Sequence, residues 1–151
     1  MNAFAKTNQI IKGLVKDFKI VKYEEQNIDY EGAILYDTQK GHLIRSRLGK
    51  LTPKKSGFFT VFWEQDIQGR NHPFCAQESP DFLLVAVYDE NRKGIFLIPK
   101  AVTIDQKILS TNTQKGKMAM RFYPVWCQGL NPTAQKTQRW QLEYFIDLSD
   151  V

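Results

Sequence analysis

Residues 82–88 (FLLVAVY) and 95–98 (IFLI) are two nearly continuous apolar runs, and they determine the fold that we expect. Each run has the length of a strand, and its β-branched and aromatic residues favour extended backbone. The polar segment Asp89–Gly94 separates the runs, and Pro99 ends the second one. We therefore predict a hairpin of two strands that lies at the centre of a sheet and is buried.

A second hairpin is predicted on the N-terminal side of this pair. Its arms are Glu31–Tyr36 and His42–Leu48, and the polar segment between them contains Gly41. Side chains alternate along a strand, so Arg45 and Arg47 are expected to share one face of the sheet. Two arginines on one strand face are well placed to contact phosphates.

The remaining elements complete an α+β pattern. Apolar residues at helical spacing predict an amphipathic helix over Asn8–Phe18, and Asn131-Pro132 is typical of a helix start, with Asn as the N-cap. The other predicted elements are a strand over Phe58–Trp63, a short helix over Ala101–Leu109 and a strand over Met118–Val125. This order favours a mixed, largely antiparallel central sheet flanked by N- and C-terminal helices. We expect residues 1–151 to form a single domain.

The composition limits the cellular location and the kinds of partner that we expect for this protein. The sequence has no apolar run long enough for a signal peptide or a membrane span, so we expect a cytoplasmic protein with no membrane partner. Cys75 and Cys127 are far apart and have no metal-ligand spacing, which predicts reduced thiols and no metal site. A net charge of +5 and a pI of about 9.2 favour a polyanionic partner.

The distribution of charge supports the same class of partner. No Asp or Glu occurs between Thr38 and Trp63, and the same holds between Gln106 and Gln141. Both stretches are rich in Lys and Arg, which predicts a basic face for nucleic acid. Aromatic residues beside these cations, including Tyr123 and Trp126, are able to stack on unpaired bases. Trp140 follows helical spacing and is expected mainly inside.

Motifs for catalysis are few. The sequence lacks a Walker loop, a GxGxxG fingerprint and a GxSxG elbow. Pro80-Asp81 and Ile98-Pro99-Lys100 follow the layout of a metal-dependent PD-(D/E)xK nuclease, except that Ile98 stands where the second acid belongs. An alternative register uses Glu31 and Arg45-Ser46-Arg47, and it lacks the same acid.

Several motifs in order resemble the MepB family, which is named for a companion protein of a bacterial multidrug-efflux operon. They are residues 44–55 (IRSRLGKLTPKK), Phe62-Trp63, Pro73-Phe74, Asp81-Phe82, Ile98-Pro99-Lys100, Gly116-Lys117, residues 121–126 (RFYPVW) and residues 134–141 (AQKTQRWQ). The resemblance covers nearly the whole chain after Tyr23. It implies a restriction-endonuclease-like fold with a nucleic-acid-binding surface and a decayed metal site.

The resulting hypothesis is a catalytically inactive, endonuclease-like domain that binds nucleic acid, with DNA as the first expectation and no cofactor. The predicted binding residues are Arg45, Arg47, Lys50, Lys54, Lys55, Lys100, Lys117, Arg121, Lys136 and Arg139. One alternative is an active nuclease or phosphodiesterase with an irregular metal site built from Glu25, Glu31 and Asp81. Another is a protein that binds a small anionic ligand or a protein partner in connection with multidrug efflux.

Overall fold

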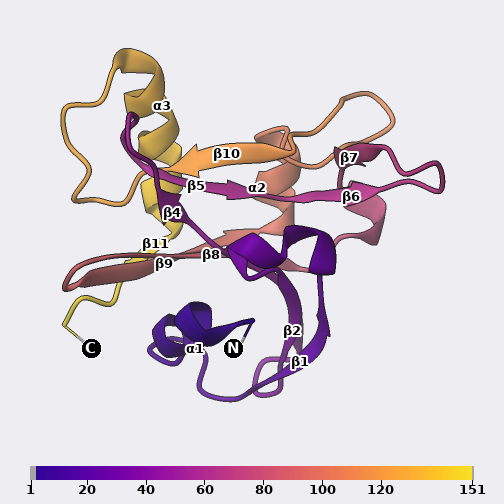
Figure 1. Cartoon of the computed structure of the whole chain (residues 1–151), viewed down its shortest axis with the longest axis horizontal. Coiled ribbons are helices and arrows are strands. Elements are labelled where there is room, and N and C mark those ends of the chain that lie inside the picture. Colours follow the sequence, from indigo (N-terminus) through magenta and orange to yellow (C-terminus); the bar gives the residue numbers. More distant parts are fainter. Residues whose placement is uncertain (1–2, 151) are drawn as a thin grey trace.

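A six-stranded sheet runs through the computed structural model, which describes residues 3–150 (Figure 1). The strand order is β1-β2-β3-β8-β9-β11. The bounds are Phe18–Tyr23 (β1), Ala33–Asp37 (β2), His42–Leu48 (β3), Phe82–Asp89 (β8), Arg92–Pro99 (β9) and Phe145–Asp147 (β11). Strands β3 and β8 pair in parallel, and the other neighbours pair antiparallel. The predicted mixed, largely antiparallel sheet is therefore confirmed.

The chain between β3 and β8 forms a second layer. Its strands are Lys50–Leu51 (β4), Phe58–Val61 (β5), Trp63–Gln65 (β6) and Asn71–Pro73 (β7). Strand Ala119–Phe122 (β10) returns later to pair with β5, which gives a three-stranded sheet in the order β10-β5-β4. Strands β6 and β7 form a separate hairpin. Figure 1 shows this layer above β8 and β9.

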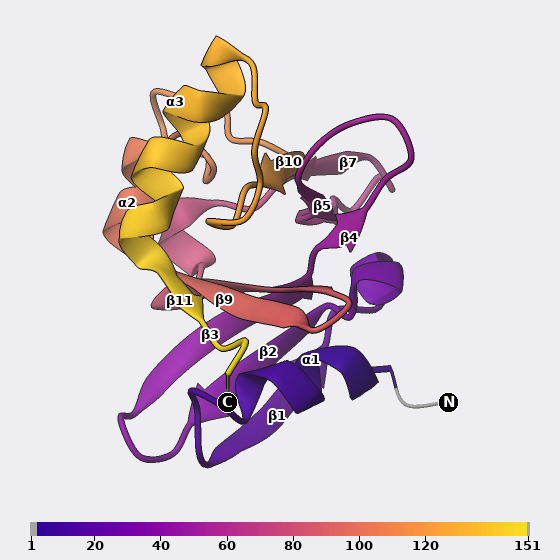
Figure 2. The ribbon, with the colours of Figure 1, turned by 90° about the vertical axis from the view of Figure 1, so that its left-hand side faces the viewer.

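Helices lie on both sides of the large sheet (Figure 2). Helix Ala5–Ile11 (α1) covers one side, and helices Lys100–Asp105 (α2) and Pro132–Gln141 (α3) lie on the side of the second layer. Three short 3-10 helices span Glu25–Tyr30 (η1), Ala76–Glu78 (η2) and Leu142–Tyr144 (η3). None of the helices within residues 3–150 has the length and apolar character needed to cross a membrane.

The predicted central hairpin is confirmed as β8 and β9, and it supplies both hydrophobic cores. Leu84 and Ile95 are fully buried against α1, whereas Val85, Phe96 and Ile98 are fully buried against the second layer and its helices. This division follows from the two-residue repeat of a strand, which sends alternate side chains to opposite faces. A strand buried on both faces needs an almost continuous apolar sequence.

Two predicted helices differ from the structure in their bounds. The helix predicted over Asn8–Phe18 ends at Ile11, and Phe18 begins strand β1 instead. Strand β1 lies at the edge of the sheet, and Ile20 and Val21 are exposed there, so its sequence lacks the pattern of a buried strand. The short helix predicted over Ala101–Leu109 ends at Asp105, and Lys107 adopts a left-handed conformation with φ of 59°.

The start of α3 agrees with the prediction. The Asn131 side chain accepts a hydrogen bond of 2.8 Å from the backbone N–H of Ala134, and Pro132 occupies the first helical position. This cap satisfies one of the free N–H groups that begin every helix.

Candidate nucleic-acid interface

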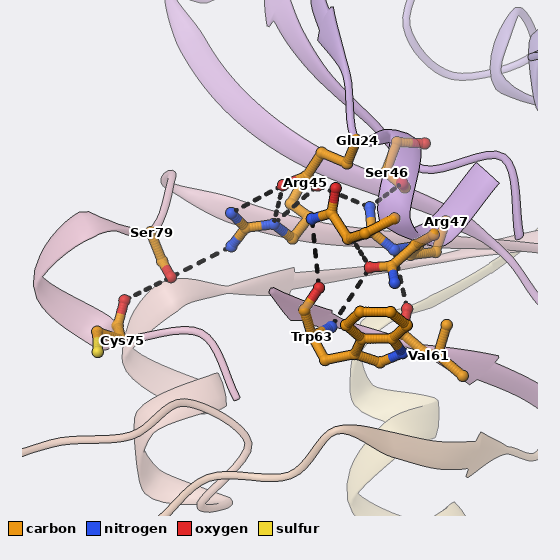
Figure 3. A network of polar contacts seen from close by, with 10 residues as sticks. Glu24, Arg45, Ser46, Arg47, Val61, Trp63, Cys75 and Ser79 are labelled. Atoms are coloured by element: carbon orange, nitrogen blue, oxygen red, sulfur yellow. Dashed lines mark hydrogen bonds and ion pairs between the residues drawn. The ribbon is translucent and has the colours of Figure 1, made fainter. Parts of the chain in front are cut away.

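Arg45 and Arg47 share one face of β3, as the strand alternation predicted, but both side chains are buried inside the protein (Figure 3). Arg45 is 8% exposed and Arg47 is fully buried. The Glu24 side chain is also buried and forms an ion pair with each guanidinium group. The predicted role of both arginines in phosphate contact is therefore incompatible with where the structure places them.

The contacts of Glu24 are short and numerous. Its Oε1 atom lies 2.8 Å from Arg47 Nη1 and 3.0 Å from Arg45 Nε. Burial alone would raise the pKa of Glu24, but the two arginines hold it below its usual value. Burial also lowers the pKa of Arg47 to about 10, while Glu24 opposes that change. Both groups are therefore charged at neutral pH.

Uncharged partners complete this network. Arg47 Nε donates to the carbonyl oxygen of Val61 at 2.8 Å, and its Nη2 donates to Asn27 Oδ1 at 2.6 Å. Arg45 Nη1 donates to Ser79 Oγ at 3.2 Å, and its guanidinium carbon lies 3.4 Å from the centre of the Phe74 ring. The network joins η1, β3 and β5 to the segment after η2. We interpret it as a structural centre, since a buried charge is tolerated only when it is paired and hydrogen-bonded.

Other predicted cations gather around an open groove. The β4–β5 loop contributes Lys54, Lys55 and Ser56, and β10 contributes Arg121. The remaining lining residues come from the segment between β10 and α3 and from α3 itself: Tyr123, Gly129, Leu130, Asn131, Thr133, Ala134 and Thr137. The groove has a volume of about 460 Å³ and no acidic residue in its lining. Figure 2 shows the β4–β5 loop and the start of α3 at the same end of the molecule.

Local contacts hold the walls of this groove together. Arg121 Nη1 donates a hydrogen bond of 3.3 Å to the carbonyl oxygen of Ser56, which connects β10 to the β4–β5 loop. Gly57 has φ of 85°, and a Cβ atom there would lie 2.6 Å from the Tyr123 ring. Glycine therefore allows the loop to turn and to pack directly on the ring.

The other predicted binding residues have different positions. Lys50 is exposed on β4, while Lys117 is exposed just before β10. Lys136 and Arg139 are exposed on α3, where Lys136 is a helical neighbour of the groove residue Thr133. Lys100 is half-buried at the start of α2, and its backbone N–H donates to the carbonyl oxygen of Asp81.

The aromatic residues divide in a similar way. Tyr123 lines the groove. Trp126 packs edge-on against Phe58 and Phe145, and the half-buried Trp140 packs on the same core. The two tryptophans are therefore largely occupied by packing, as expected for Trp140.

The acidic residues of the nuclease alternative do not converge. Glu31 accepts hydrogen bonds from the backbone N–H groups of Lys6 and Thr7 at 3.3 and 2.8 Å, in the first turn of α1. Asp81 accepts one from the backbone N–H of Leu43 at 3.0 Å. Within residues 3–150, no group of three or more His, Cys, Asp or Glu side chains is arranged to hold a metal ion.

Comparison with known proteins identifies the family. A family model described as MepB-like matches residues 24–147. The chain belongs to the MepB-like family. A solved structure described as the crystal structure of MepB is 36% identical in sequence, with a TM-score of 0.84, and the match covers 95% of this chain and 97% of that chain. The comparison with curated proteins gave no match.

Sequence reasoning missed the partners of this MepB-like chain's arginines. Glu24 precedes Arg45 by 21 residues and lies just before helix η1, outside the acid-free stretch. It also missed Tyr30 and Phe59, which lie beside Lys50 of β4 and Arg121 of β10. The available signal was the alternation in β5, where Phe58 and Thr60 face the core and leave Phe59 on the opposite face.

Proposed function

We propose that this protein binds nucleic acid through the groove between the β4–β5 loop and α3. The observation that carries the proposal is the grouping of Lys54, Lys55 and Arg121 around one hollow whose lining has no acidic residue. Clustered cations release the counterions of a phosphate backbone when they bind it, which gives affinity without sequence specificity.

Three other hollows of the described surface include carboxylates in their lining. The one beside Tyr23 contains Glu24, Glu64 and Glu78, and the one beside β4 contains Asp89 and Glu90. The hollow beside α1 contains Glu90 together with Lys6 and Lys93. A polyanion approaching these hollows would meet carboxylates. The hollow beside Phe74 has no acidic residue, but its volume is only about 20 Å³, so the groove at α3 is the favourable site for a polyanion.

Helix α3 adds to the positive potential of the groove. Its first turn contains no acidic residue, and its N-terminal end borders the lysines of the loop. The aligned peptide dipoles place a partial positive charge at this end. Arg121 then offers a planar, permanently charged group that suits a phosphate oxygen pair.

The proposal assigns binding rather than cleavage. In the endonuclease-like layout, the second acid of the triplet would hold the metal ion, and Ile98 occupies that position in the buried core. A mixed sheet with helices on both sides is compatible with descent from such a nuclease. We therefore propose that the chain has the nucleic-acid-binding surface of such a nuclease and lacks metal-dependent cleavage.

A direct test compares two variants that each remove three positive charges. Lys54→Ala/Lys55→Ala/Arg121→Ala removes those of the groove, and Lys12→Ala/Lys16→Ala/Lys19→Ala removes exposed charges near α1 and β1. Fluorescence anisotropy with labelled single-stranded and duplex DNA and RNA is measured over a range of salt concentrations. We expect wild-type affinity to fall steeply with salt, and the groove variant to reduce the salt slope by about 2 for single strands and about 3 for duplexes.

The control variant should retain most of the affinity. The proposal is wrong if the wild type binds no nucleic acid at low salt, or if both variants lose affinity equally. Release of fragments from the probes in the presence of Mg²⁺ would instead favour the active nuclease.

A further inference from the structure

The outer face of the β10-β5-β4 sheet carries a row of alternating cations and rings. Lys50 pairs with Phe59 on one side, and Arg121 pairs with Phe59 on the other. Directly paired residues of neighbouring strands project from the same face of a sheet. The opposite face holds Phe58 and Phe122, which are buried in the core between the two layers. Phe59 therefore lies between two cations on the side away from the core.

A second ring extends this row beyond the sheet. Tyr30, at the end of η1, meets Phe59 edge-on with 6.0 Å between the ring centres. Lys50 Nζ lies 5.1 Å from the centre of the Tyr30 ring, and the guanidinium carbon of Arg121 lies 5.4 Å from that of Phe59. Both rings are partly exposed, so the four side chains form one accessible patch. We call Tyr30, Lys50, Phe59 and Arg121 the aromatic row.

Arg121 belongs to both the aromatic row and the groove. Its guanidinium reaches the Ser56 carbonyl at the groove wall and also lies beside the Phe59 ring. The row ends at Lys50, next to the hollow that contains Asp89 and Glu90. A polyanion that extends from the groove across Arg121 and Phe59 would be repelled by the carboxylates beyond Lys50.

We propose that the aromatic row selects single-stranded nucleic acid, with unpaired bases stacked on the Phe59 ring and on the Tyr30 ring and the neighbouring phosphates held by Lys50 and Arg121. This inference rests on the proposed function, because the groove supplies the remaining phosphate contacts. Unpaired bases expose a π face that stacks on aromatic rings regardless of sequence. A duplex keeps its bases inside the stack, so the rings would add little to its affinity.

The experiment uses the full chain and three probes of about 15 nucleotides. This length is near the longest stretch of single strand that one OB-fold domain occupies. The probes are labelled oligothymidylate, a strand of the same length in which the central nucleotides are abasic, and a duplex. The abasic strand keeps its phosphates and loses its bases. We expect the wild type to bind oligothymidylate at least tenfold more tightly than the abasic strand, and more tightly than the duplex.

Variants then locate the contribution of the rings. Phe59→Leu and Tyr30→Leu should each weaken binding of oligothymidylate by about tenfold and leave binding of the abasic strand unchanged. Tyr36→Leu serves as the matched control, since Tyr36 is an exposed aromatic residue on β2, outside the row. This control should bind all three probes as the wild type does.

The two proposals fail in different ways. If the wild type binds none of the probes at low salt, both the groove and the aromatic row are wrong. If it binds the probes but holds the abasic strand as tightly as oligothymidylate, the groove survives and the stacking inference is overturned. An equal loss of affinity for the two strands in Phe59→Leu would also overturn the stacking inference. The wild-type comparison requires no substitution, so it decides the question even if a variant fails to fold.

Discussion

The buried network around Glu24 and the open groove at α3 use the same kinds of positive side chain for opposite purposes. Arg45 and Arg47 are enclosed, and each contacts the Glu24 carboxylate. Lys54 and Lys55 are exposed, and neither forms an ion pair with a residue in the described part of the chain. Both pairs come from one acid-free stretch of sequence, so local charge composition does not distinguish a structural cation from a binding one.

The difference between the two regions is where the counter-charge comes from. Glu24 enters the network from a distant segment and forms an ion pair with each arginine. The groove at α3 has no such carboxylate, so its charge remains available to a partner. Substitutions in the first region should affect folding, and substitutions in the second should affect binding.

The largest effect is expected for Glu24→Gln. This change leaves two buried guanidinium groups without their counter-charge, and breaking a buried pair costs about 3–5 kcal/mol. Urea unfolding of the variant should show a decrease of this size in the free energy of unfolding. Glu25→Gln is the matched control, because Glu25 is exposed, and it should be close to wild type. Equal stability of the two variants would contradict a structural role for the network.

A smaller effect is expected from acid. The folded-state pKa of Glu24 lies below its usual value, so its stabilising contribution is complete above the unfolded-state pKa of about 4.3 and is lost as the pH falls through the lower folded value. The wild type should therefore lose more stability than Glu24→Gln between neutral pH and about pH 3. Thermal unfolding of both proteins across this range measures the difference, and parallel curves would argue against a charged Glu24.

The smallest effect on stability is expected in the groove. Lys54→Ala/Lys55→Ala removes two exposed charges that take no part in the core, so the free energy of unfolding should change by about 0.5 kcal/mol or less. Chemical unfolding checks this value on the same preparation that is used for binding. A loss of several kcal/mol would show that the loop lysines are structural, and the comparison between the two regions would then no longer hold.

Local signals in the sequence predicted much of the fold. The two hairpins and the Asn131 cap were identified correctly, because turns, alternation and caps depend on residues close in sequence. The edge strand β1 was missed, since its exposed apolar residues and lysines do not alternate as a buried strand does. The burial of Arg45 and Arg47 could not be predicted from neighbouring residues, because their ion-pair partner Glu24 lies 21 residues before Arg45 in the sequence.

Convergence of the two basic stretches was anticipated in part. Lys54 and Lys55 come from the first acid-free stretch and Arg121 comes from the second, and the pairing of β5 with β10 brings them to one groove. Lys100 lies apart, at the start of α2. Which cations share a surface depends on strand pairing, and the sequence alone did not specify that β10 returns to β5.

The parallel pairing of β3 with β8 has a consequence for how the molecule folds. Residues 49–81 leave the large sheet after β3 and return at β8, so the second layer is a long excursion between two adjacent central strands. The hairpins β2–β3 and β8–β9 involve short loops and are expected to form early, whereas the parallel ladder must first close the long loop. The aromatic row and the groove, which both need β5, are therefore expected to be among the last parts of the native structure to assemble.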